Sequence, residues 1–378
     1  MVGAFQHVRR ANVSRGAATM MSTTSDHGSR SGRAPVALAL IGAGRIARVH
    51  ARNLRSPEVT VVGVADPDRE AADHLAGLLG TTPYTRWEDL LATGGVDAVM
   101  VCSASDAHAE QVAAAASSGK HVLCEKPLAT DLAGVDSALA AVERSGVVLH
   151  VGFNRRFDPG FADLARTVAE GGIGRLLQLR ITSRDPEPPP AGYPRGPGGL
   201  FADMVIHDFD VARYVSGEEV VAVSAAGSSL VDPLAGAAGD LDVAVVTLRF
   251  ASGAIGMIEC CRVSTYGYDQ RVEVHGTGAT AWTTNPHPTT SVLADGGGAR
   301  SSPLFRFFPE RYERAYAAEL AAFLAACRGE DAGPAATGRD ARAALVLAEA
   351  ARLSVLDGRT VPLVEVDPRV AEPLGDRP

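Results

Sequence analysis

The stretch Val36-Ala-Leu-Ala-Leu-Ile-Gly-Ala-Gly-Arg-Ile-Ala47 determines the fold class that we predict for this chain. Its first half, Val36–Ile41, is continuously apolar, which is typical of a strand buried on both faces of a parallel sheet. Its second half is a G-x-G-x-x-A turn that leads into a helical stretch. In such a turn Gly42 permits the tight bend, and Gly44 lets the backbone approach a pyrophosphate. The stretch therefore predicts a dinucleotide-binding unit whose helix N–H groups face the phosphates.

An acidic residue stands at the end of the next predicted strand, Val59–Val64. Asp66 follows that strand at about the distance from the glycine turn that a ribose-binding acid requires. A carboxylate there accepts hydrogen bonds from the ribose hydroxyls of NAD and repels the additional phosphate of NADP. Asp66 could instead cap a helix that begins at Pro67. Because strand, glycines and helix are in register, we expect Asp66 to bind the cofactor and the cofactor to be NAD.

Strands and helices continue to alternate as far as residue 153. Apolar strands are predicted at Ala98–Val101, Val122–Leu123 and Val147–Val151, separated by Ala-rich helical stretches at Ala107–Ser118 and Leu132–Ser145. This alternation predicts an α/β fold with a doubly wound parallel sheet, a Rossmann domain over residues 35–153. Ligands of such sheets bind at the carboxyl ends of the strands.

The second half of the chain has the pattern of an α+β domain. We place this substrate-binding and oligomerisation domain at residues 154–365, followed by a tail at 366–378, and expect a large, open, mostly antiparallel sheet. The predicted strands and the C-terminal helices that pack back are Leu176–Thr182, Val220–Ala225, Val243–Phe250, Ala254–Cys260, Arg271–His275, Ala315–Ala326 and Ala341–Leu356. The segments Asp232–Asp240 and Thr289–Ser302 are expected to be surface loops. An uncovered sheet face is a candidate oligomer interface, because monomers rarely expose large apolar surfaces.

The first 34 residues differ in composition from the rest. Five arginines, with Asp26 as the single acid, lie among Ser, Thr, Ala and Gly. We interpret residues 1–34 as a disordered extension, and Met20 or Met21 could be the true start. An Arg- and Ser-rich, acid-poor start is also typical of a transit peptide, although no apolar core or amphipathic face accompanies it.

The composition excludes several classes of function. The chain has 378 residues, of which 46% are hydrophobic and 21% charged, with a net charge of −8. That charge argues against a nucleic-acid partner bound through a cationic face, and no uncharged apolar run reaches the roughly 20 residues that span a bilayer. The 5 cysteines contain no C-x-x-C pair, so we expect no disulfide scaffold and a cytoplasmic location.

Lys126 is the first candidate for chemistry, since it follows the fifth strand in the run Cys124-Glu-Lys-Pro127. An ammonium beside the nicotinamide can hydrogen-bond a substrate hydroxyl and stabilise charge on its oxygen as hydride leaves the carbon. The alternative is a solvated lysine in a loop that proline rigidifies. Position alone does not choose between these two.

Asp203 and His207 form the second candidate, beyond a Pro- and Gly-rich loop. If their segment is helical, the two side chains lie on one face, where a carboxylate orients an imidazole and stabilises its protonated form. That arrangement serves a general base. The alternative is structural, with both groups satisfying buried backbone. We expect no metal, because no third and fourth zinc ligand recur at suitable spacing.

Four separated motifs, in order, resemble the glucose–fructose oxidoreductase/inositol dehydrogenase family. The resemblance covers roughly Pro35 to the end, and inositol 2-dehydrogenases are the members that it resembles most closely. The motifs, with two further stretches similar to that subgroup, are Gly42–Ala47, Cys124–Ala129, Gly152–Asp158, Gly198–Asp210, Thr182–Pro186 and Phe307–Tyr312.

The resemblance implies NAD-dependent oxidation of a ring secondary hydroxyl of a cyclitol to a ketone, with myo-inositol giving 2-keto-myo-inositol (scyllo-inosose) as in inositol catabolism. It implies that His207 removes the hydroxyl proton, Asp203 supports it and Lys126 positions the oxygen. It also implies a cis bond between Lys126 and Pro127 and a homotetramer or homodimer assembled through the C-terminal sheet.

The resulting site prediction has three parts. The catalytic residues are Lys126, Asp203 and His207. The residues expected to contact NAD are Gly42, Gly44, Arg45, Ile46, Asp66, Ser103, His108, Glu125 and Lys126. The polyol pocket is expected to contain Asn154, Arg155, Asp185 and one of Tyr266 or Tyr268, with Tyr268 preferred. Of Arg155 and Arg156, one is expected to bind substrate or cofactor and the other to form a structural ion pair; the residues do not choose between them, although Arg155 is nearer the strand end.

Two departures from the family pattern concern substrate choice. Asn154 occupies a place where the inositol dehydrogenases that the chain resembles often carry Met, and residues 191–197 form an unusually Gly- and Pro-rich pocket loop. scyllo-Inositol, an aminocyclitol or a sugar, including one of antibiotic biosynthesis, therefore stays open as the substrate. A non-catalytic dinucleotide-sensing regulator is the alternative of another class, because fold does not determine function. Such regulators typically lose the lysine or the base, and this chain keeps both.

Overall fold

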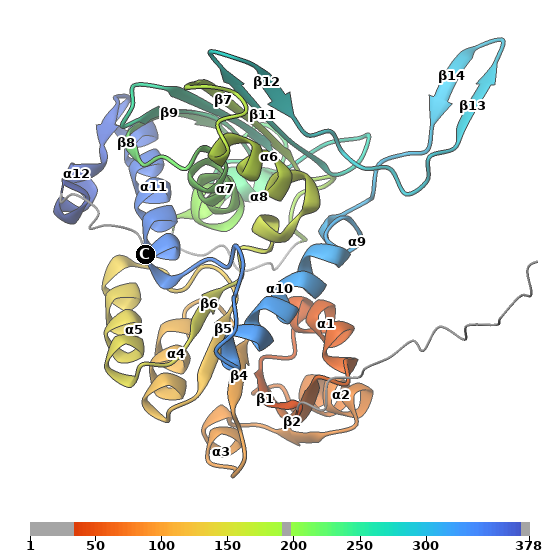
Figure 1. Ribbon diagram of the computed structural model, residues 1–378, viewed down its shortest axis with the longest axis vertical. Helices are drawn as coiled ribbons and strands as arrows, with labels where there is room; N and C mark the ends of the chain where they lie inside the picture. Colours follow the sequence, from red (N-terminus) through yellow and green to blue (C-terminus); the bar gives the residue numbers. More distant parts are fainter. Residues whose placement is uncertain (1–33, 191–197, 372–378) are drawn as a thin grey trace, which may run out of the picture. The chain divides into compact units, whose positions relative to one another are not determined.

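The structure is a computed structural model that describes residues 34–190 and 198–371 (Figure 1). The described residues from Pro35 onward form one compact unit. The expected N-terminal extension before residue 34, the pocket loop 191–197 and the tail beyond residue 371 lie outside the described residues. Among the described residues no helix is long and apolar enough to cross a membrane.

A six-stranded parallel sheet lies in the N-terminal half, with strand order β3-β2-β1-β4-β5-β6. Its strands are β1 (Val36–Ile41), β2 (Val59–Ala65), β3 (Thr82–Tyr84), β4 (Ala98–Val101), β5 (His121–Cys124) and β6 (Leu149–Val151). All pairs are parallel, which is the doubly wound topology of dinucleotide-binding folds. The predicted Rossmann sheet is therefore confirmed.

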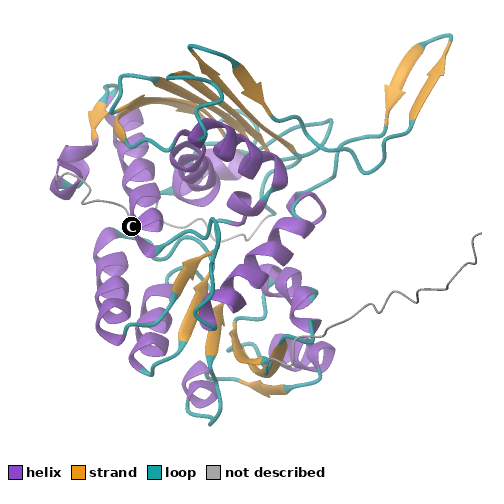
Figure 2. Ribbon diagram, viewed as in Figure 1, coloured by secondary structure: helices purple, strands orange, loops and turns teal. Residues whose placement is uncertain are grey.

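Helices cover both faces of this sheet (Figure 2). They are α1 (Arg45–Ala51), a short η1 (Asn53–Arg55), α2 (Arg69–Leu79), α3 (Trp87–Leu91), α4 (His108–Ser117) and α5 (Leu132–Ser145). Local chemistry sets their ends: Asp68 and Asp131 cap the first turns of α2 and α5 through their carboxylates. Gly80 and Gly146 end the same two helices in the left-handed conformation that glycine adopts without strain.

A seven-stranded sheet lies in the C-terminal half, in the order β12-β11-β7-β10-β9-β8-β15. Its strands are β7 (Leu176–Arg184), β8 (Val220–Ser228), β9 (Val243–Phe250), β10 (Ile255–Cys261), β11 (Asp269–Gly276), β12 (Thr280–Trp282) and β15 (Val361–Pro362). Only the β10–β7 pair is parallel, so the prediction of a mostly antiparallel sheet is confirmed. Buried and exposed residues alternate along β9, which shows that one face is covered and the other open.

The covered face packs against helices (Figure 1). α11 runs along β8 and α7 along β7, and both sheets contribute to one hydrophobic core. The remaining elements are η2 (Asn154–Phe157), α6 (Pro159–Ala169), α7 (Ile206–Ser216), α9 (Phe308–Arg311), α10 (Glu313–Cys327), α11 (Gly338–Asp357), α12 (Leu363–Val366) and η4 (Pro368–Ala371). A domain boundary between residues 153 and 154 stays a prediction.

Three segments differ from the sequence-based expectation. The expected loop Asp232–Asp240 contains the short helix α8 (Pro233–Ala237), and the expected loop Thr289–Ser302 contains a hairpin of β13 (Val292–Asp295) and β14 (Gly298–Ser301). The segment η3 (Phe201–Val205) is a π-helical turn ahead of α7. Each of these helices and strands has five residues or fewer, which is too short for a repeating pattern of hydrophobic residues to reveal it.

Candidate active site

A cavity of about 1010 Å³ lies where the carboxyl ends of the parallel strands meet the second half of the fold. Apart from Gly42, every residue of the predicted site lines it: Gly44, Arg45, Ile46, Asp66, Ser103, His108, Glu125, Lys126, Asn154, Arg155, Asp185, Asp203, His207 and Tyr268. The cavity thus brings the glycine turn, the lysine and the histidine together. Tyr266 is half exposed and donates from its hydroxyl to the buried Asp269 carboxylate, and it does not line the cavity, so Tyr268 is the tyrosine of the cavity.

The two glycines of the turn meet different surroundings. Gly42 has φ +97°, and a Cβ there would lie 2.5 Å from the carbonyl carbon of Cys102. Gly44 lines the cavity, and a Cβ there would have no protein atom within 4 Å. Gly42 is thus required by the fold itself, whereas Gly44 leaves an open cradle of the kind that a pyrophosphate fills.

We therefore expect two alanine variants of the turn to separate folding from binding. Gly42→Ala should lower the free energy of unfolding by about 3 kcal/mol, since it combines a left-handed conformation with a backbone clash. Gly44→Ala should change it by less than about 0.5 kcal/mol and weaken NAD binding roughly tenfold or more. Urea denaturation without cofactor and calorimetric titration with NAD measure the two effects. Equal destabilisation by both variants would contradict this assignment.

Asp66 is anchored to the glycine turn. Its Oδ2 accepts a hydrogen bond from the Ala43 N–H at 2.7 Å, and its Oδ1 accepts one from the Asp68 N–H at 2.8 Å. The side-chain cap of α2 is Asp68, so the helix-cap alternative for Asp66 is wrong. The carboxylate oxygens retain lone pairs that can accept ribose hydroxyls at the cavity wall.

The loop after β4 is tied to the loop after β5 by His108. Its Nδ1 lies 2.8 Å from the Pro127 carbonyl and its Nε2 lies 3.1 Å from the Ser103 carbonyl. Burial lowers the pKa of this imidazole, which favours the neutral ring, and a neutral ring donates to one of the two carbonyls at a time. The cis bond between Lys126 and Pro127 is present, which confirms that prediction. His108 thus holds the two loops that carry Ser103 and Lys126 at one edge of the sheet.

Lys126 extends from the Rossmann sheet to the π-helical turn of the other half. Its Nζ donates to the Asp203 carbonyl at 2.6 Å and lies 3.6 Å from the Asp203 Oδ1. An ammonium has three donors, so others remain for an alcohol oxygen in the cavity. The alternative of a solvated loop lysine does not fit this contact.

His207 sits in the first turn of α7, with its ring edge-on to Phe153 at 5.9 Å. Its Nδ1 is buried and makes no hydrogen bond to a described group. Burial, together with the positive charges of Lys126 and Arg155, lowers its pKa well below the usual value. The imidazole is therefore neutral at physiological pH, which is the form that accepts a proton.

The Asp203 carboxylate is held by a residue that the sequence analysis did not select. Arg262, at the end of β10 and buried, donates from a terminal guanidinium nitrogen to the Asp203 Oδ2 at 2.9 Å. The groups that shift the pKa of His207 do not include Asp203, so support of His207 by that carboxylate stays a prediction. Arg262 lies fifty-odd residues from the motif in the chain, and no local pattern marks it.

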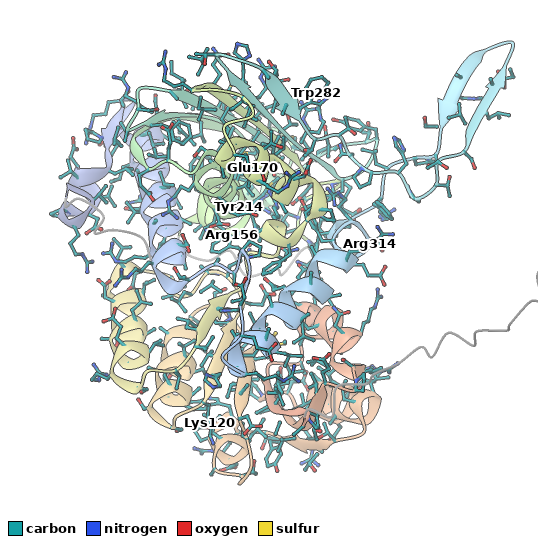
Figure 3. All side chains as sticks on the ribbon, in the orientation of Figure 1. Lys120, Arg156, Glu170, Tyr214, Trp282 and Arg314 are labelled. Carbon is teal, nitrogen blue, oxygen red and sulfur yellow. The ribbon has the colours of Figure 1, made fainter. Side chains whose placement is uncertain are left out.

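The far wall of the cavity is built on buried charge pairs. Arg155 donates to the Asp208 Oδ1 at 2.5 Å and to the Tyr268 hydroxyl at 3.5 Å. Arg156 instead donates to the buried Asp210, and its guanidinium lies over the Tyr214 ring at 5.2 Å, so Arg156 is the arginine without a place in the cavity that forms a structural ion pair. Figure 3 labels Arg156 and Tyr214. Asn154 is 2% exposed, and its Nδ2 donates to no described group.

Asp185 lies among charges of both signs. Burial is the main cause that raises its pKa, to about 6, and the neighbouring Asp203 raises it further while Arg262 and Arg155 lower it. It is therefore ionised above about pH 6 and neutral below. As an ionised wall residue it only accepts hydrogen bonds from hydroxyls, and protonation turns one of these acceptor oxygens into a donor.

We accordingly expect the KM for a polyol to rise roughly tenfold between about pH 7 and about pH 5, since the ionised fraction of a group with such a pKa falls by that factor. In Asp185→Asn the KM should be higher at neutral pH and independent of pH over this range. Initial rates at saturating NAD measure both profiles. A pH step of the same size in the variant would assign the titration to another group.

The sequence analysis also missed an aromatic wall. Phe307, Phe308, Tyr312 and Tyr316 line the cavity from α9, α10 and the segment before them, and the guanidinium of Arg45 lies 5.3 Å from the Phe308 ring. The run Phe307–Tyr312 is similar to a stretch of the inositol 2-dehydrogenases, but nothing in it indicates that the C-terminal part of the chain returns to the Rossmann sheet.

Two family models match the chain. Residues 36–153 match the oxidoreductase family with an NAD-binding Rossmann fold, and residues 161–282 match the GFO/IDH/MocA C-terminal domain. The fold and the cavity define an NAD-binding oxidoreductase, and the chain belongs to the GFO/IDH/MocA family.

Two named relatives and one solved structure are similar to this chain over most of its length. Myo-inositol 2-dehydrogenase of Thermotoga maritima is 45% identical over 87% of this chain and 99% of its own length. The scyllo-inositol 2-dehydrogenase (NAD(+)) of Bacillus subtilis is 36% identical over 87% of this chain and 96% of its own. Among solved structures, a myo-inositol dehydrogenase from Corynebacterium glutamicum has a TM-score of 0.81 and 38% identity, covering 87% of this chain and 99% of that one.

Proposed function

We propose that this chain oxidises the 2-hydroxyl of myo-inositol to the ketone, giving 2-keto-myo-inositol, with NAD as the oxidant. One observation carries the proposal: Lys126 from the Rossmann sheet and a neutral His207 from the C-terminal half line the same cavity as the glycine turn. The relatives named for inositol oxidation support the substrate class.

The cavity fits NAD at one end. Gly44 leaves an open cradle at the turn, and the fixed carboxylate of Asp66 offers acceptors to a ribose. Glu125 and Lys126 line the cavity further along, toward His207. The nicotinamide of a bound NAD would supply the hydride acceptor, a role that no side chain of the protein can fill.

The protein residues handle the proton and the oxygen. His207 accepts the hydroxyl proton, and its low pKa keeps it in the base form at neutral pH. The Lys126 ammonium hydrogen-bonds the same oxygen and stabilises the charge that develops there. Arg262 bonds to the Asp203 Oδ2 at 2.9 Å while the Lys126 Nζ lies 3.6 Å from the Oδ1, so the carboxylate is held by the guanidinium and orients the ammonium.

Substrate hydroxyls would meet a polar wall of complementary groups. The unused Nδ2 of Asn154 and the Tyr268 and Arg155 side chains supply donors, and the Asp185 carboxylate supplies acceptors. A ring that carries a hydroxyl on every carbon fits such a wall, because each buried donor or acceptor finds a partner.

A substrate panel tests the proposal. NADH formation should be fastest with myo-inositol when it is compared with scyllo-inositol, an aminocyclitol and glucose at equal concentration, and NADP should support much less. If scyllo-inositol alone were oxidised, the proposed reaction would stand and scyllo-inositol would replace myo-inositol as the substrate. Binding of NAD with no turnover of any polyol would overturn the enzymatic proposal and favour the dinucleotide-sensing alternative.

We further propose that the open face of the second sheet joins copies of this chain into a homodimer or homotetramer. Val245, Ile255 and Met257 are 44%, 52% and 36% exposed on that face, and Figure 3 shows Trp282 at the edge of the same sheet. Val245→Glu with Ile255→Glu should reduce the mass measured by light scattering, whereas Leu78→Glu on α2, 48% exposed, should not. A monomeric wild type would contradict the assembly.

A cytoplasmic location is consistent with the cysteines. All 5 lie in the described residues and are free, and three are buried. Proteins of oxidising compartments more often pair such residues. We propose the cytoplasm on this ground.

A further inference from the structure

A buried acid with no partner lies behind the cavity. Glu319, on α10, is 1% exposed, and neither of its carboxyl oxygens hydrogen-bonds a described group. An isolated buried carboxylate is so costly that the group takes up a proton instead. Burial and the nearby charge of Glu125 raise the pKa of Glu319 well above its usual value, in agreement with this.

Glu319 belongs to a cluster that ends at the cavity. His50, 1% exposed on α1, contacts the Glu125 Oε1 through its Nε2 at 2.7 Å, and Glu125 lines the cavity next to Lys126. The His50 ring also meets the Tyr316 ring edge-on at 5.2 Å, and Tyr316 lies one helical turn before Glu319. The cluster therefore runs from α10 through α1 to the wall of the cavity.

Two groups in this cluster make no hydrogen bond to a described group. When the His50 Nε2–H donates to the Glu125 carboxylate, Nδ1 is left as an acceptor, and it is buried without a hydrogen bond. The Glu319 carboxyl is the second such group, so it is not bonded to His50. The other titratable groups around Glu125 and Glu319 are Cys102, Cys124, His108, Lys126 and Tyr316. The thiols and the phenol have raised pKa values, so they stay neutral, and Lys126 is the cation of the group.

We propose that the unpartnered, buried Glu319 is protonated, so that the cluster of Glu125, His50 and Glu319 carries a single negative charge, on Glu125 at the cavity wall beside its His50 contact. That charge faces the nicotinamide end and stabilises the cationic oxidised ring over the neutral reduced ring. His50 is thus a positioning residue that holds the charged Glu125, and the neutral Glu319 adds no charge of its own. The inference rests on the proposed position of the nicotinamide beside Lys126.

Cofactor binding tests this without any polyol. We expect Glu125→Gln to lower the ratio of the NADH to the NAD dissociation constant roughly tenfold, the effect of one charge several Å from a cationic ring. Glu319→Gln, which replaces one neutral group by another, should leave the ratio within about twofold of the wild type. His50→Leu should lower the ratio, because the Glu125 carboxylate loses the donor that holds it at the cavity wall, and His50→Gln should restore it. Calorimetric titrations with NAD and NADH measure these ratios.

Infrared spectroscopy provides a second measurement on the folded protein. The band of a buried protonated carboxyl should be present in the wild type and in Glu125→Gln and absent in Glu319→Gln. An unchanged ratio in Glu125→Gln, a ratio in Glu319→Gln as low as in Glu125→Gln, or loss of the band in Glu125→Gln instead would each overturn the proposal. If the protein failed to oxidise polyols, the expected dissociation-constant ratios and infrared bands would not change. This proposal and the proposed function can therefore fail independently.

Discussion

Lys126→Ala is expected to lower the turnover number for polyol oxidation about 10³-fold or more, the range for removal of one donor that stabilises a developing oxyanion. Lys126 belongs to the Rossmann half, and its ammonium donates to the Asp203 carbonyl of the C-terminal half at 2.6 Å. The ammonium therefore lies between the two halves of the fold. The dissociation constant of NAD should change less than about threefold, because the phosphates and the ribose bind elsewhere along the cavity. Steady-state rates and calorimetric titration measure the two quantities.

The chain offers a matched control for this variant. Lys120 and Lys126 are the only two lysines among the 378 residues, and Lys120 precedes β5 whereas Lys126 follows it. Figure 3 shows Lys120 at the far end of the parallel sheet. Lys120→Ala should retain wild-type turnover, and Lys126→Arg should recover only part, since a planar guanidinium does not reproduce a compact ammonium. Wild-type turnover in Lys126→Ala would exclude the assigned role.

His207→Gln is expected to lower kcat by about 10²-fold to 10⁴-fold, the usual contribution of a general base. The wild-type imidazole has a pKa well below its usual value, so its base form persists as the pH falls below neutral, and it imposes no acid limb near pH 7. The residual rate of the variant should rise with pH, because hydroxide then has to remove the proton. A pH profile of kcat for both proteins shows the difference.

His150 offers a control for the His207 variant. It is also buried, and burial lowers its pKa to about 4, but it packs against Phe323 and does not line the cavity. His150→Gln should therefore cost stability and leave kcat near that of the wild type. If it lowered kcat as much as His207→Gln does, the effect would come from repacking and not from proton transfer.

The elements with many apolar repeats could be predicted from the sequence. β1, β4, β9 and α5 begin and end at the predicted residues, because a doubly buried strand, an alternating strand and a capped amphipathic helix each carry a strong local signal. The hairpin of β13 and β14 has four residues in each strand, all exposed, and no burial pattern marks it.

The residues of the candidate site also divide into those that a local sequence pattern could reveal and those that it could not. Gly44, Lys126 and His207 stand in local motifs at strand or helix ends, so spacing and resemblance could select them. Arg262 and the aromatic wall line the cavity, and Glu319 lies behind it, only because β10 and α10 return to the cavity. Their roles depend on contacts between distant segments, which one sequence does not encode in any local pattern.

The central claim is that hydride passes from a cyclitol carbon to NAD while Lys126 and His207 act on its oxygen. The most direct measurement uses myo-inositol deuterated at C2 with unlabelled NAD, followed by mass spectrometry of the reduced cofactor. We predict that the cofactor gains one deuterium, at a rate reduced by the isotope in the wild type and nearly abolished in Lys126→Ala. Reduced cofactor without deuterium, or deuterium transfer as fast in Lys126→Ala as in the wild type, would contradict the claim.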